Sequence, residues 1–279
     1  MIIAITGGTG FIGSKLREHF PSPEHTLRIA GRKTPDRVML EGADAVIHLA
    51  GEPVAQRWNA SVKQLILDSR VKGTRDLIAV LKTVKNRPPV LISASAIGFY
   101  GDCADDKVTE ESSQGPGFLA EVCAQWEQAS HEAADLGLRV VNPRIGVVLG
   151  RDGGALAKML PAFRMGFGGR LGEGCQWMSW IHIEDLVRLF HFVMENSHVR
   201  GAINAVVPNP VTNAEFTAQL ARVLSRPAFL PVPAFALRLL FGEMADVMLT
   251  GQRVLPARAI QAGFTFSHPE LTPALKTLV

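Results

Sequence analysis

The sequence contains little cysteine, no block of like charges and no long apolar run. Its three cysteines, Cys103, Cys123 and Cys175, lack the spacing of a metal or redox site, which indicates a reducing compartment. No apolar run approaches the ~18 residues of a membrane span. The net charge is only +3, and no basic cluster indicates nucleic acid or a membrane surface as a partner. We therefore expect a cytoplasmic protein without a metal site that acts on a small molecule.

The first thirteen residues combine an apolar run with a cluster of glycines. Residues 2–6 form a predicted strand, and Gly8, Gly10 and Gly13 then fit the pattern G-x-G-x-x-G before an amphipathic stretch. In a strand–turn–helix unit, such glycines allow a tight turn, close approach of backbone to a pyrophosphate, and close helix–strand packing. The helix N-terminus presents free N–H groups to the phosphates. The pattern predicts a dinucleotide-binding loop, with a glycine-rich surface turn as the alternative.

The end of the second predicted strand distinguishes between two dinucleotides. Residues 26–30 form this strand, and Gly31-Arg32-Lys33 follows it. An Asp or Glu at this place would accept a hydrogen bond from the ribose 2′-hydroxyl of NAD. The Arg32 guanidinium cannot accept one, but it can pair with the 2′-phosphate of NADP. We therefore predict NADP(H) as the cofactor, with a solvated strand end as the alternative role of Arg32 and Lys33.

Apolar strands alternate with helical stretches through the first half of the chain. Hydrophobic residues make up 47% of the 279 residues, which is enough for a large core. The alternation predicts an α/β fold with a Rossmann-type, doubly wound parallel sheet. We expect an NADP-binding Rossmann domain over residues 1–150 and a smaller substrate lobe over 151–279, which includes a small C-terminal domain at 231–279. The helical patterns at 59–85 and 118–136 could pack two copies into a homodimer.

Several further positions lie where a doubly wound sheet holds its ligand. Ala50 and Gly51 end an apolar strand and are small enough for a cofactor to lie against the backbone. Arg70, within a predicted helix, faces either the cofactor or solvent. Ser95 stands at the carboxyl end of a strand, the edge that faces the ligand crevice. His48 lies inside an apolar strand, and we expect it to be a packed core residue.

Together these motifs resemble the extended short-chain dehydrogenase/reductase superfamily, which includes nucleotide-sugar epimerases. The segment Thr6–Gly13 is similar to its opening T-G-G-x-G-F-I-G, and residues 46–51 are similar to its V-I-H-L-A-G strand. The likeness is closer still to an atypical branch, the "epimerase family" proteins with a small C-terminal domain of unknown function. Residues 57–59, 69–70 and 251–256 carry that branch's patterns.

The resemblance spans essentially the whole chain and implies the fold and the cofactor, but not a substrate. It also implies which residues contact NADP(H). They belong to the glycine loop, the ends of the second and third strands, and two later positions: Gly7, Thr9, Gly10, Phe11, Ile12, Gly13, Gly31, Arg32, Leu49, Ala50, Gly51, Arg70 and Val148.

The single tyrosine is a departure from this superfamily, whose chemistry rests on Tyr-x-x-x-Lys. In that pair the tyrosine transfers a proton and the lysine lowers its pKa. Here Tyr100 belongs to a Tyr-Gly turn; if Glu127 matches the superfamily's helix glutamate, Leu119 replaces the tyrosine and Cys123 the lysine. Leucine cannot transfer a proton, and Cys123 is either a small core residue or a proton-transfer group. Ser95 remains the candidate catalytic residue, able to orient a substrate or donate a hydrogen bond.

Three functions are consistent with this pattern. The first is an NADP(H)-dependent oxidoreductase that acts on an unknown small molecule without the usual tyrosine and lysine. The second is a non-catalytic NADP-binding regulatory or scaffold protein. The third is a nucleotide-sugar epimerase, which we rank last because its transient hydride transfer needs the tyrosine base.

Overall fold

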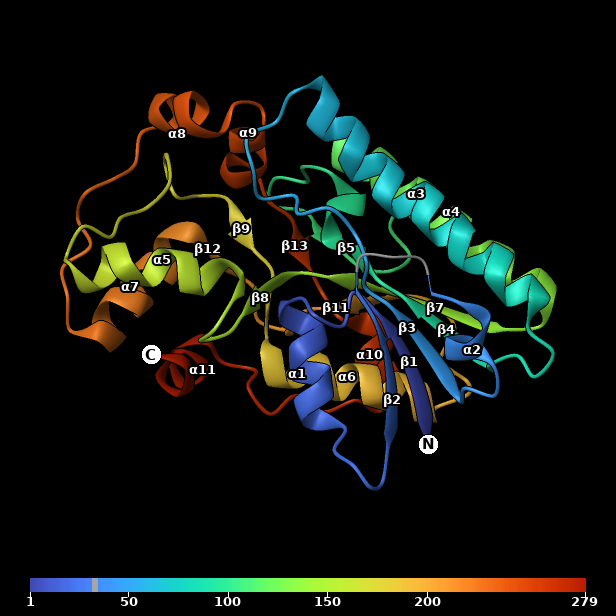
Figure 1. Ribbon diagram of the computed structural model, residues 1–279. Helices are drawn as coiled ribbons and strands as arrows, with labels where there is room; N and C mark the ends of the chain where they lie inside the picture. The colour runs from blue at the N-terminus through green and yellow to red at the C-terminus, as the bar shows by residue number, and fades with distance from the viewer. Residues whose placement is uncertain (32–34) are drawn as a thin grey trace.

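The computed structural model describes residues 1–31 and 35–279, and a large parallel sheet crosses it (Figure 1). The strand order is β11-β7-β4-β3-β1-β2, with the short β5 beside β7, and every pairing is parallel. This is the predicted Rossmann-type fold, which is thereby confirmed. The strands of the sheet are β1 (Ile2–Thr6), β2 (Thr26–Ala30), β3 (Ala45–His48), β4 (Val90–Ser93), β5 (Ser95–Ala96), β7 (Arg139–Ile145) and β11 (Gly201–Ala205).

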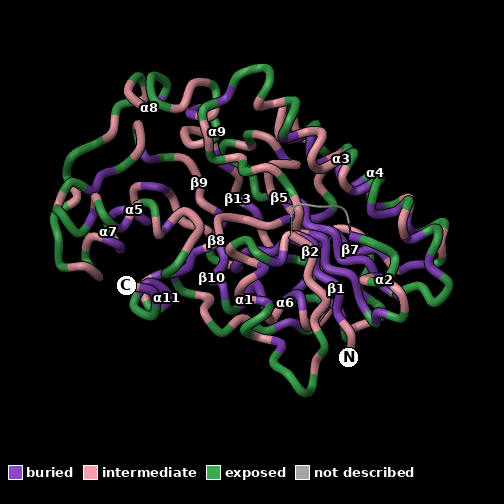
Figure 2. The backbone as a smooth tube through the Cα atoms, viewed as in Figure 1, coloured by how far each residue is buried: buried purple, intermediate pink, exposed green. Residues whose placement is uncertain are grey.

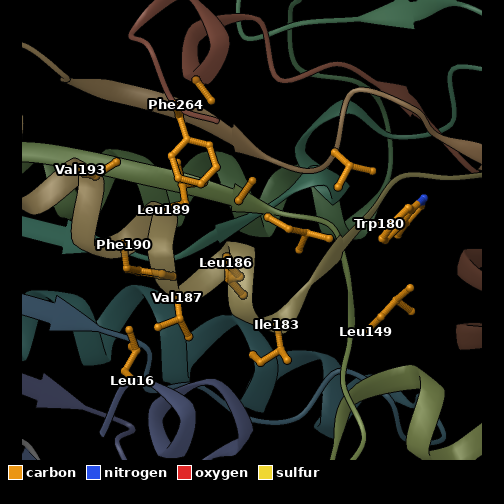
Figure 3. Packing of buried hydrophobic residues seen from close by; sticks show 14 of the residues in the cluster. Leu16, Leu149, Trp180, Ile183, Leu186, Val187, Leu189, Phe190, Val193 and Phe264 are labelled. Atoms are coloured by element: carbon orange, nitrogen blue, oxygen red, sulfur yellow. The ribbon is translucent and has the colours of Figure 1, made fainter. Parts of the chain in front are cut away.

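Each face of the sheet packs into its own hydrophobic core because successive side chains of a strand point to opposite faces. Ile3, Ile5 and Ile47 join the core that contains Leu16 of α1 (Phe11–His19) and most of α6 (Ile183–Glu195), as Figure 3 shows in part. Ala4 and Val46 face the second core, which α3 (Ala60–Thr83) covers. Figure 2 shows the strands as a buried layer between these helices. Helices therefore cover both faces, as a doubly wound sheet requires.

The two long predicted helices are present with small differences at their ends. The predicted helix at 59–85 is α3, whose start is fixed by the Asn59 side chain accepting a hydrogen bond from the Val62 backbone at 2.8 Å. The predicted helix at 118–136 is α4 (Phe118–His131) followed by the 3₁₀ turn η2 (Glu132–Leu136). Gly137 ends this stretch with φ 85°, a left-handed conformation that favours glycine.

The sheet continues past residue 150, where the sequence placed the end of the binding domain. Strand β11 pairs in parallel with β7, and α6 provides the crossover that packs on the face of the sheet. The residues of β11 are Gly-Ala-Ile-Asn-Ala, whose short and weakly apolar pattern hides a strand. A boundary at 150 therefore does not separate the sheet from the rest of the chain, and the division into domains stays a prediction.

Small sheets and short helices complete the C-terminal half. Strand β8 pairs with β10, β9 with β12, and β6 with β13. Within the described residues, no helix combines the length and the apolar character needed to cross a membrane. The remaining elements are α2 (Arg37–Leu40), η1 (Ile97–Tyr100), β6 (Lys107–Val108), β8 (Val147–Leu149), α5 (Gly154–Arg164), β9 (Trp177–Met178), β10 (Trp180–His182), β12 (Val211–Thr212), α7 (Asn213–Leu224), α8 (Ala234–Phe241), α9 (Met244–Leu249), β13 (Arg253–Val254), α10 (Ala257–Gln261) and α11 (Leu271–Leu278).

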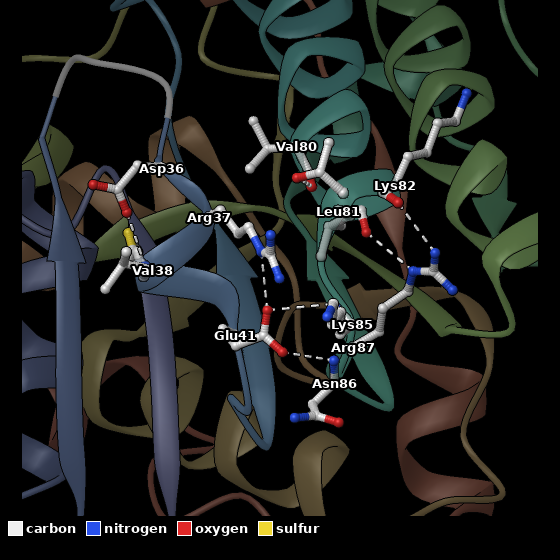
Figure 4. A network of polar contacts seen from close by, with 12 residues as sticks. Asp36, Arg37, Val38, Glu41, Val80, Leu81, Lys82, Lys85, Asn86 and Arg87 are labelled. Atoms are coloured by element: carbon white, nitrogen blue, oxygen red, sulfur yellow. Dashed lines mark hydrogen bonds and ion pairs between the residues drawn. The ribbon is translucent and has the colours of Figure 1, made fainter.

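A polar network fixes α2 against the turn between α3 and β4. The Glu41 carboxylate accepts hydrogen bonds from the backbone N–H of Asn86 at 2.8 Å and from Arg37 Nε at 3.2 Å (Figure 4). Arg87 Nε donates to the carbonyl of Leu81 at 3.0 Å and closes the end of α3. These hydrogen bonds therefore attach α2 to the C-terminal end of α3, the end opposite to the Asn59 cap.

Candidate functional site

The direction in which the chain crosses the sheet reverses between β1 and β3. From β1 the chain continues to β2 on one side and then crosses to β3 on the other. In doubly wound sheets, ligands bind outside the carboxyl ends of the strands at such a switch point. The last residues of the two strands, Thr6 and His48, are paired, and the Leu49 N–H donates to the Thr6 carbonyl at 3.1 Å. The glycine loop and the turn after β3 therefore meet at the place where a ligand is expected.

The glycine loop has the compact geometry that its sequence predicts. Gly7 adopts φ 69°, and its carbonyl accepts a hydrogen bond from the Gly10 N–H at 3.0 Å. A Cβ on Gly13 would lie 2.5 Å from Gly8 Cα, and a Cβ on Gly8 would lie 2.7 Å from Ile29 Cγ2. Helix α1 and strand β2 can approach the loop this closely only because both positions are glycine. The N–H groups of the first turn of α1 have no partner within the helix and can bind an anion.

The turn after β3 brings a small-residue backbone against an arginine. A Cβ on Gly51 would lie 3.2 Å from Arg70 Cζ. Arg70 Nη1 donates to the carbonyls of Glu52 at 3.0 Å and Ile66 at 3.2 Å, and the guanidinium lies 5.1 Å from the centre of the Trp126 ring. Burial lowers the pKa of Arg70 from its ordinary value. The structure thus places Arg70 beside Gly51, where it holds the turn.

The Phe11 side chain packs against a second glycine-rich turn. A Cβ on Gly150, Gly153 or Gly154 would collide with or touch the Phe11 ring. This turn follows β8, which contains Val148 and pairs with β10. These three glycines were not expected to lie beside Phe11. No local pattern signals this contact, because Phe11 and the three glycines lie far apart in the sequence.

His48 is a packed core residue, as predicted. Its Nδ1 shares a 2.6 Å hydrogen bond with Thr6 Oγ1, and its Nε2 shares a 3.0 Å hydrogen bond with Thr74 Oγ1. Complete burial lowers the pKa of His48 to about 4, so the ring is neutral at pH 7. It links the ends of β1 and β3 to α3.

A buried ionic network lies at the carboxyl ends of β5, β7 and β11, and sequence reasoning missed it. Arg144 Nε and Nη2 donate to the two Glu127 carboxylate oxygens, each at 2.8 Å. Arg144 Nη1 donates to Tyr100 Oη at 2.9 Å, and Tyr100 donates to Asn204 Oδ1 at 2.7 Å. Ser95 Oγ donates to Glu127 Oε1 at 2.6 Å. Burial alone would lower the pKa of Arg144, but the bonds and charge of Glu127 raise it.

The positions expected to replace the tyrosine and lysine face η1 across an apolar contact. A Cβ on Gly98 would lie 3.2 Å from Leu119 Cβ and 3.9 Å from Cys123 Sγ. Burial raises the pKa of the Cys123 thiol to about 11, so it is protonated at neutral pH and cannot serve as a base. Ser95 is 2% exposed, and its proton is committed to Glu127. The catalytic role predicted for Ser95 stays a prediction.

The other predicted cofactor residues differ in their exposure. Thr9 and Gly10 are exposed at the tip of the glycine loop, and Ile12 is partly buried against the core. A Cβ on Gly31 would meet no atom of the described residues within 4 Å. Arg32 lies outside the described residues.

Within residues 1–31 and 35–279, His182, Glu184 and His268 form the one cluster with metal-ligating atoms close together. His182 Nδ1 already accepts a hydrogen bond from the Glu184 N–H at 3.1 Å, and its Nε2 contacts Thr277 Oγ1 at 3.1 Å. Both ring nitrogens therefore have protein partners. The cluster joins the start of α6 to the C-terminal helix.

Two family models match the chain. The model described as "NAD dependent epimerase/dehydratase family" matches residues 3–205, and a model described as "Domain of unknown function (DUF1731)" matches residues 232–278. The first match ends with β11, the edge strand of the sheet.

Named relatives align along nearly the whole chain. The epimerase family protein SDR39U1 homolog of Arabidopsis thaliana, described as chloroplastic, is 41% identical, with 100% of this chain and 87% of the relative covered. Epimerase family protein Mb2239 of Mycobacterium bovis is 41% identical over 98% of this chain and 96% of its own. The crystal structure of human epimerase family protein SDR39U1 (isoform 2) with NADPH aligns with a TM-score of 0.93 and 34% identity, covering 100% of this chain and 99% of that one.

Proposed function

The chain belongs to the NAD-dependent epimerase/dehydratase family, and on that premise we propose that it is an atypical short-chain dehydrogenase/reductase that uses NADP(H) to reduce or oxidise a small molecule. One observation carries the proposal. The glycine loop after β1 and the turn after β3 meet at the switch point of the sheet, beside the N-terminus of α1. That arrangement binds the pyrophosphate of a dinucleotide.

The residues of the loop fit this cofactor. Any side chain at Gly13 would push α1 away from the loop, and any side chain at Gly7 would meet the backbone of Ala50 at 2.8 Å. Thr9 and Gly10, between these two glycines, are exposed, so this part of the loop is open to a ligand. Leu49, Ala50 and Gly51 form the opposite wall of the same cradle.

NADP(H) is favoured over NAD(H) by two observations. The human relative was crystallised with NADPH and aligns with this whole chain. The sequence places a cation, Arg32, where an acidic residue would select NAD. The charge of Arg32 suits a 2′-phosphate.

The chemistry divides between cofactor and chain. When bound, NADPH supplies a hydride. The chain orients the substrate and manages the accompanying proton, and we propose Ser95 as the residue that contacts the substrate oxygen. Because Ser95 donates to Glu127, its hydroxyl must turn toward a substrate to donate there, with water as the alternative proton source.

A non-catalytic NADP-binding protein is the second candidate. Two observations favour it, because each removes a candidate proton-transfer group. The Cys123 thiol is protonated, and the Ser95 hydroxyl donates to the Glu127 carboxylate of a buried ion pair. In such a protein, the cofactor would act as a ligand that reports the ratio of NADPH to NADP⁺. Nucleotide-sugar epimerisation stays the third, because Leu119 offers no proton base.

Cofactor titration followed by a substrate panel tests the proposal. NADPH and NADH are titrated against the tryptophan fluorescence of the purified protein and of Arg32→Ala. We expect NADPH to bind more tightly and the variant to lose roughly 1.5–3 kcal/mol toward NADPH alone. Equal losses toward both cofactors would contradict the 2′-phosphate role of Arg32.

The second arm follows NADPH absorbance in the presence of ketones, aldehydes and enones. If one class of compound causes NADPH to be oxidised, and if the rate of that oxidation is at least tenfold lower in Ser95→Ala, the oxidoreductase is supported. Tight NADPH binding without turnover across the panel supports the non-catalytic protein.

Location and assembly follow as smaller proposals. We place the protein in the cytoplasm because all three of its cysteines are free thiols. We also propose a homodimer through α3 and α4, which lie side by side along one face in Figure 1. Light scattering of the purified protein measures the assembly directly.

A further inference from the structure

Large apolar side chains project from one side of the C-terminal half. Six of them are each at least 63% exposed, and we call this set the apolar surface: Met165, Phe167, Phe229, Phe235, Leu239 and Leu240. Side chains exposed to this extent stand out from a protein, whereas side chains that line a groove are largely covered. A gathering of such groups marks a place where a protein meets a partner or a membrane.

Two loops and one helix bring these side chains to the same side of the molecule. The Val232 N–H donates to the Arg170 carbonyl at 2.8 Å, and the Gly172 N–H donates to the Val232 carbonyl at 2.9 Å. The loop after α5 therefore runs beside the loop that joins α7 to α8. Figure 1 shows α5, α7 and α8 on the left of the molecule, with the large sheet on the right.

Helix α8 turns an apolar face toward solvent. Its buried residue is Leu237, and Phe235 and Leu239 share the opposite face because they are four residues apart. A surface helix normally turns polar residues outward and apolar residues inward. The outward face of α8 is apolar and has no partner among the described residues.

The segments that carry the apolar surface contain basic residues and no acidic ones. Residues 154–172 and 216–242 include six Lys and Arg and no Asp or Glu, although the whole chain has 29 Lys and Arg and 26 Asp and Glu. All six cations are exposed, and Arg238 pairs with Asp246 of α9 at 3.1 Å. Within residues 1–31 and 35–279, the other five form no ion pair: Lys158, Arg164, Arg170, Arg222 and Arg226. Because they are spaced along the chain, the sequence shows no basic cluster.

These charges distinguish between the possible occupants of the apolar surface. In a symmetric contact between two copies, the same cations would face one another and repel. Nucleic acid would pair with the cations, but Met165, Leu239 and Leu240 offer no ring on which a base could stack. A membrane with anionic lipids meets both needs, because its head groups attract the cations and its acyl boundary takes up the apolar side chains.

We propose that the apolar surface docks the protein onto a membrane that contains anionic lipids. Phe229, Phe235 and Leu239 enter the boundary between head groups and acyl chains, and Arg164 and Arg226 contact the head groups. The cytoplasmic leaflet of a membrane carries anionic lipids, so the proposal fits the location proposed above.

Co-sedimentation of the full chain with lipid vesicles tests the proposal. One kind of vesicle contains phosphatidylcholine alone, and the other contains equal parts of phosphatidylcholine and phosphatidylglycerol. We expect binding to the anionic vesicles, weaker binding to them at high salt, and little binding to the neutral vesicles. Absence of binding to the anionic vesicles, or equal binding to both kinds, would overturn the proposal.

One pair of substitutions tests the apolar side chains. Phe229→Ser/Phe235→Ser should weaken binding to the anionic vesicles at least about tenfold. The two phenylalanines are 74% and 73% exposed, so the core stays intact. Val38→Ser is the control, because Val38 is an exposed residue of α2 outside the apolar surface, and its binding should match that of the wild type. Light scattering without vesicles compares the assemblies, and a smaller assembly in the double variant would assign the apolar surface to a second copy and overturn the proposal.

A second pair of substitutions tests the charges. Arg164→Gln/Arg226→Gln should weaken binding to the anionic vesicles at least about tenfold. Lys82→Gln/Lys85→Gln removes the same amount of charge from exposed positions at the C-terminal end of α3 and should have a smaller effect. Circular dichroism reports whether each variant is folded. Equal losses of binding in the two charge variants would overturn the proposal.

Discussion

Arg144 and Glu127 form a two-point ion pair inside the protein, with both contacts at 2.8 Å and both side chains almost fully buried. Arg144 comes from β7 and Glu127 from α4, so the pair joins the sheet to the helix that covers it. Tyr100 and Ser95 add their hydroxyl groups to it. The network lies at the edge of the sheet where catalytic groups are expected. Its two charges, on Arg144 and Glu127, are paired with each other.

Breaking one side of this pair should be costly. Arg144→Met leaves the Glu127 carboxylate buried and unpaired, and we expect a loss of about 3–5 kcal/mol in the free energy of unfolding. The double variant Glu127→Gln/Arg144→Met removes both charges and should recover part of that loss. Urea denaturation measures each value.

A surface pair provides the control for this prediction. Arg75 and Glu132 contact each other at 2.9 Å with both side chains about half exposed. Arg75→Met should cost no more than about 1 kcal/mol. Similar losses of unfolding free energy in Arg75→Met and Arg144→Met would contradict the prediction that breaking the buried pair costs more than breaking a surface pair.

The glycine loop should not tolerate a single methyl group at its closest approach. Gly13→Ala would place a Cβ 2.5 Å from Gly8 Cα, and the loop must open to relieve this contact. We expect NADPH binding to weaken at least about tenfold, which corresponds to ~1.4 kcal/mol. Tryptophan fluorescence titration measures the dissociation constant.

Gly73→Ala is the matched control for the loop. Gly73 lies within α3, and a Cβ there would meet no atom within 4 Å. Alanine in a helix interior should stabilise the protein by about 0.5–1 kcal/mol and leave NADPH binding unchanged. Unaltered cofactor affinity in Gly13→Ala would show that the loop is not the binding cradle.

Acid should destabilise the protein through His48. Burial lowers its pKa in the folded protein to about 4, below the ordinary value of 6.5. The unfolded chain therefore binds a proton first as the pH falls, and stability is lost between pH 6.5 and pH 4 by up to about 3 kcal/mol. Urea denaturation across this range should show a smaller decline in His48→Gln.

The exposed His198 is the comparison for this pH effect, and His198→Gln should follow the wild-type decline. Some decline should persist in His48→Gln, because burial also lowers the pKa of His182 to about 4. An identical pH dependence in wild type and His48→Gln would show that His48 is not held neutral.

The three thiols should react in a fixed order. Cys175 is exposed, Cys103 is partly buried, and Cys123 is buried. With its pKa raised to about 11, only about a thousandth of the Cys123 thiol is ionised at pH 8. Mass spectrometry after iodoacetamide treatment should find Cys175 modified first and Cys123 only after unfolding, and Cys175→Ser should remove the fast adduct. Early modification of Cys123 would reopen its role as a proton-transfer group.

Local patterns predicted the parts of the protein that local physics determines. The spacing of Gly8, Gly10 and Gly13 predicted a strand–turn–helix, because a side chain at Gly10 or Gly13 would press on the loop itself and one at Gly8 would press on Ile29 of the neighbouring strand. The helical periodicity predicted α3 to within two residues at either end. His48 was predicted to be buried because its strand neighbours are apolar.

Contacts between distant segments were harder to predict. Glu127 and Arg144 were each visible in the sequence, but their pairing depends on how α4 packs across β7. The contact of Phe11 with Gly153 joins residues at opposite ends of the binding half. Strand β11 was missed for the same reason, since Gly201–Ala205 becomes a strand only beside β7.

The late position of β11 has a consequence for synthesis on the ribosome. Strand β7 is complete at Ile145, but its outer neighbour is complete only at Ala205. At about 5–20 residues per second, β7 waits roughly 3–12 s with unpaired N–H and C=O groups along one side. Such an edge can pair with another nascent chain. Translation speed between these two strands, rather than the stability of the finished fold, therefore sets how long the growing protein is exposed to misassembly.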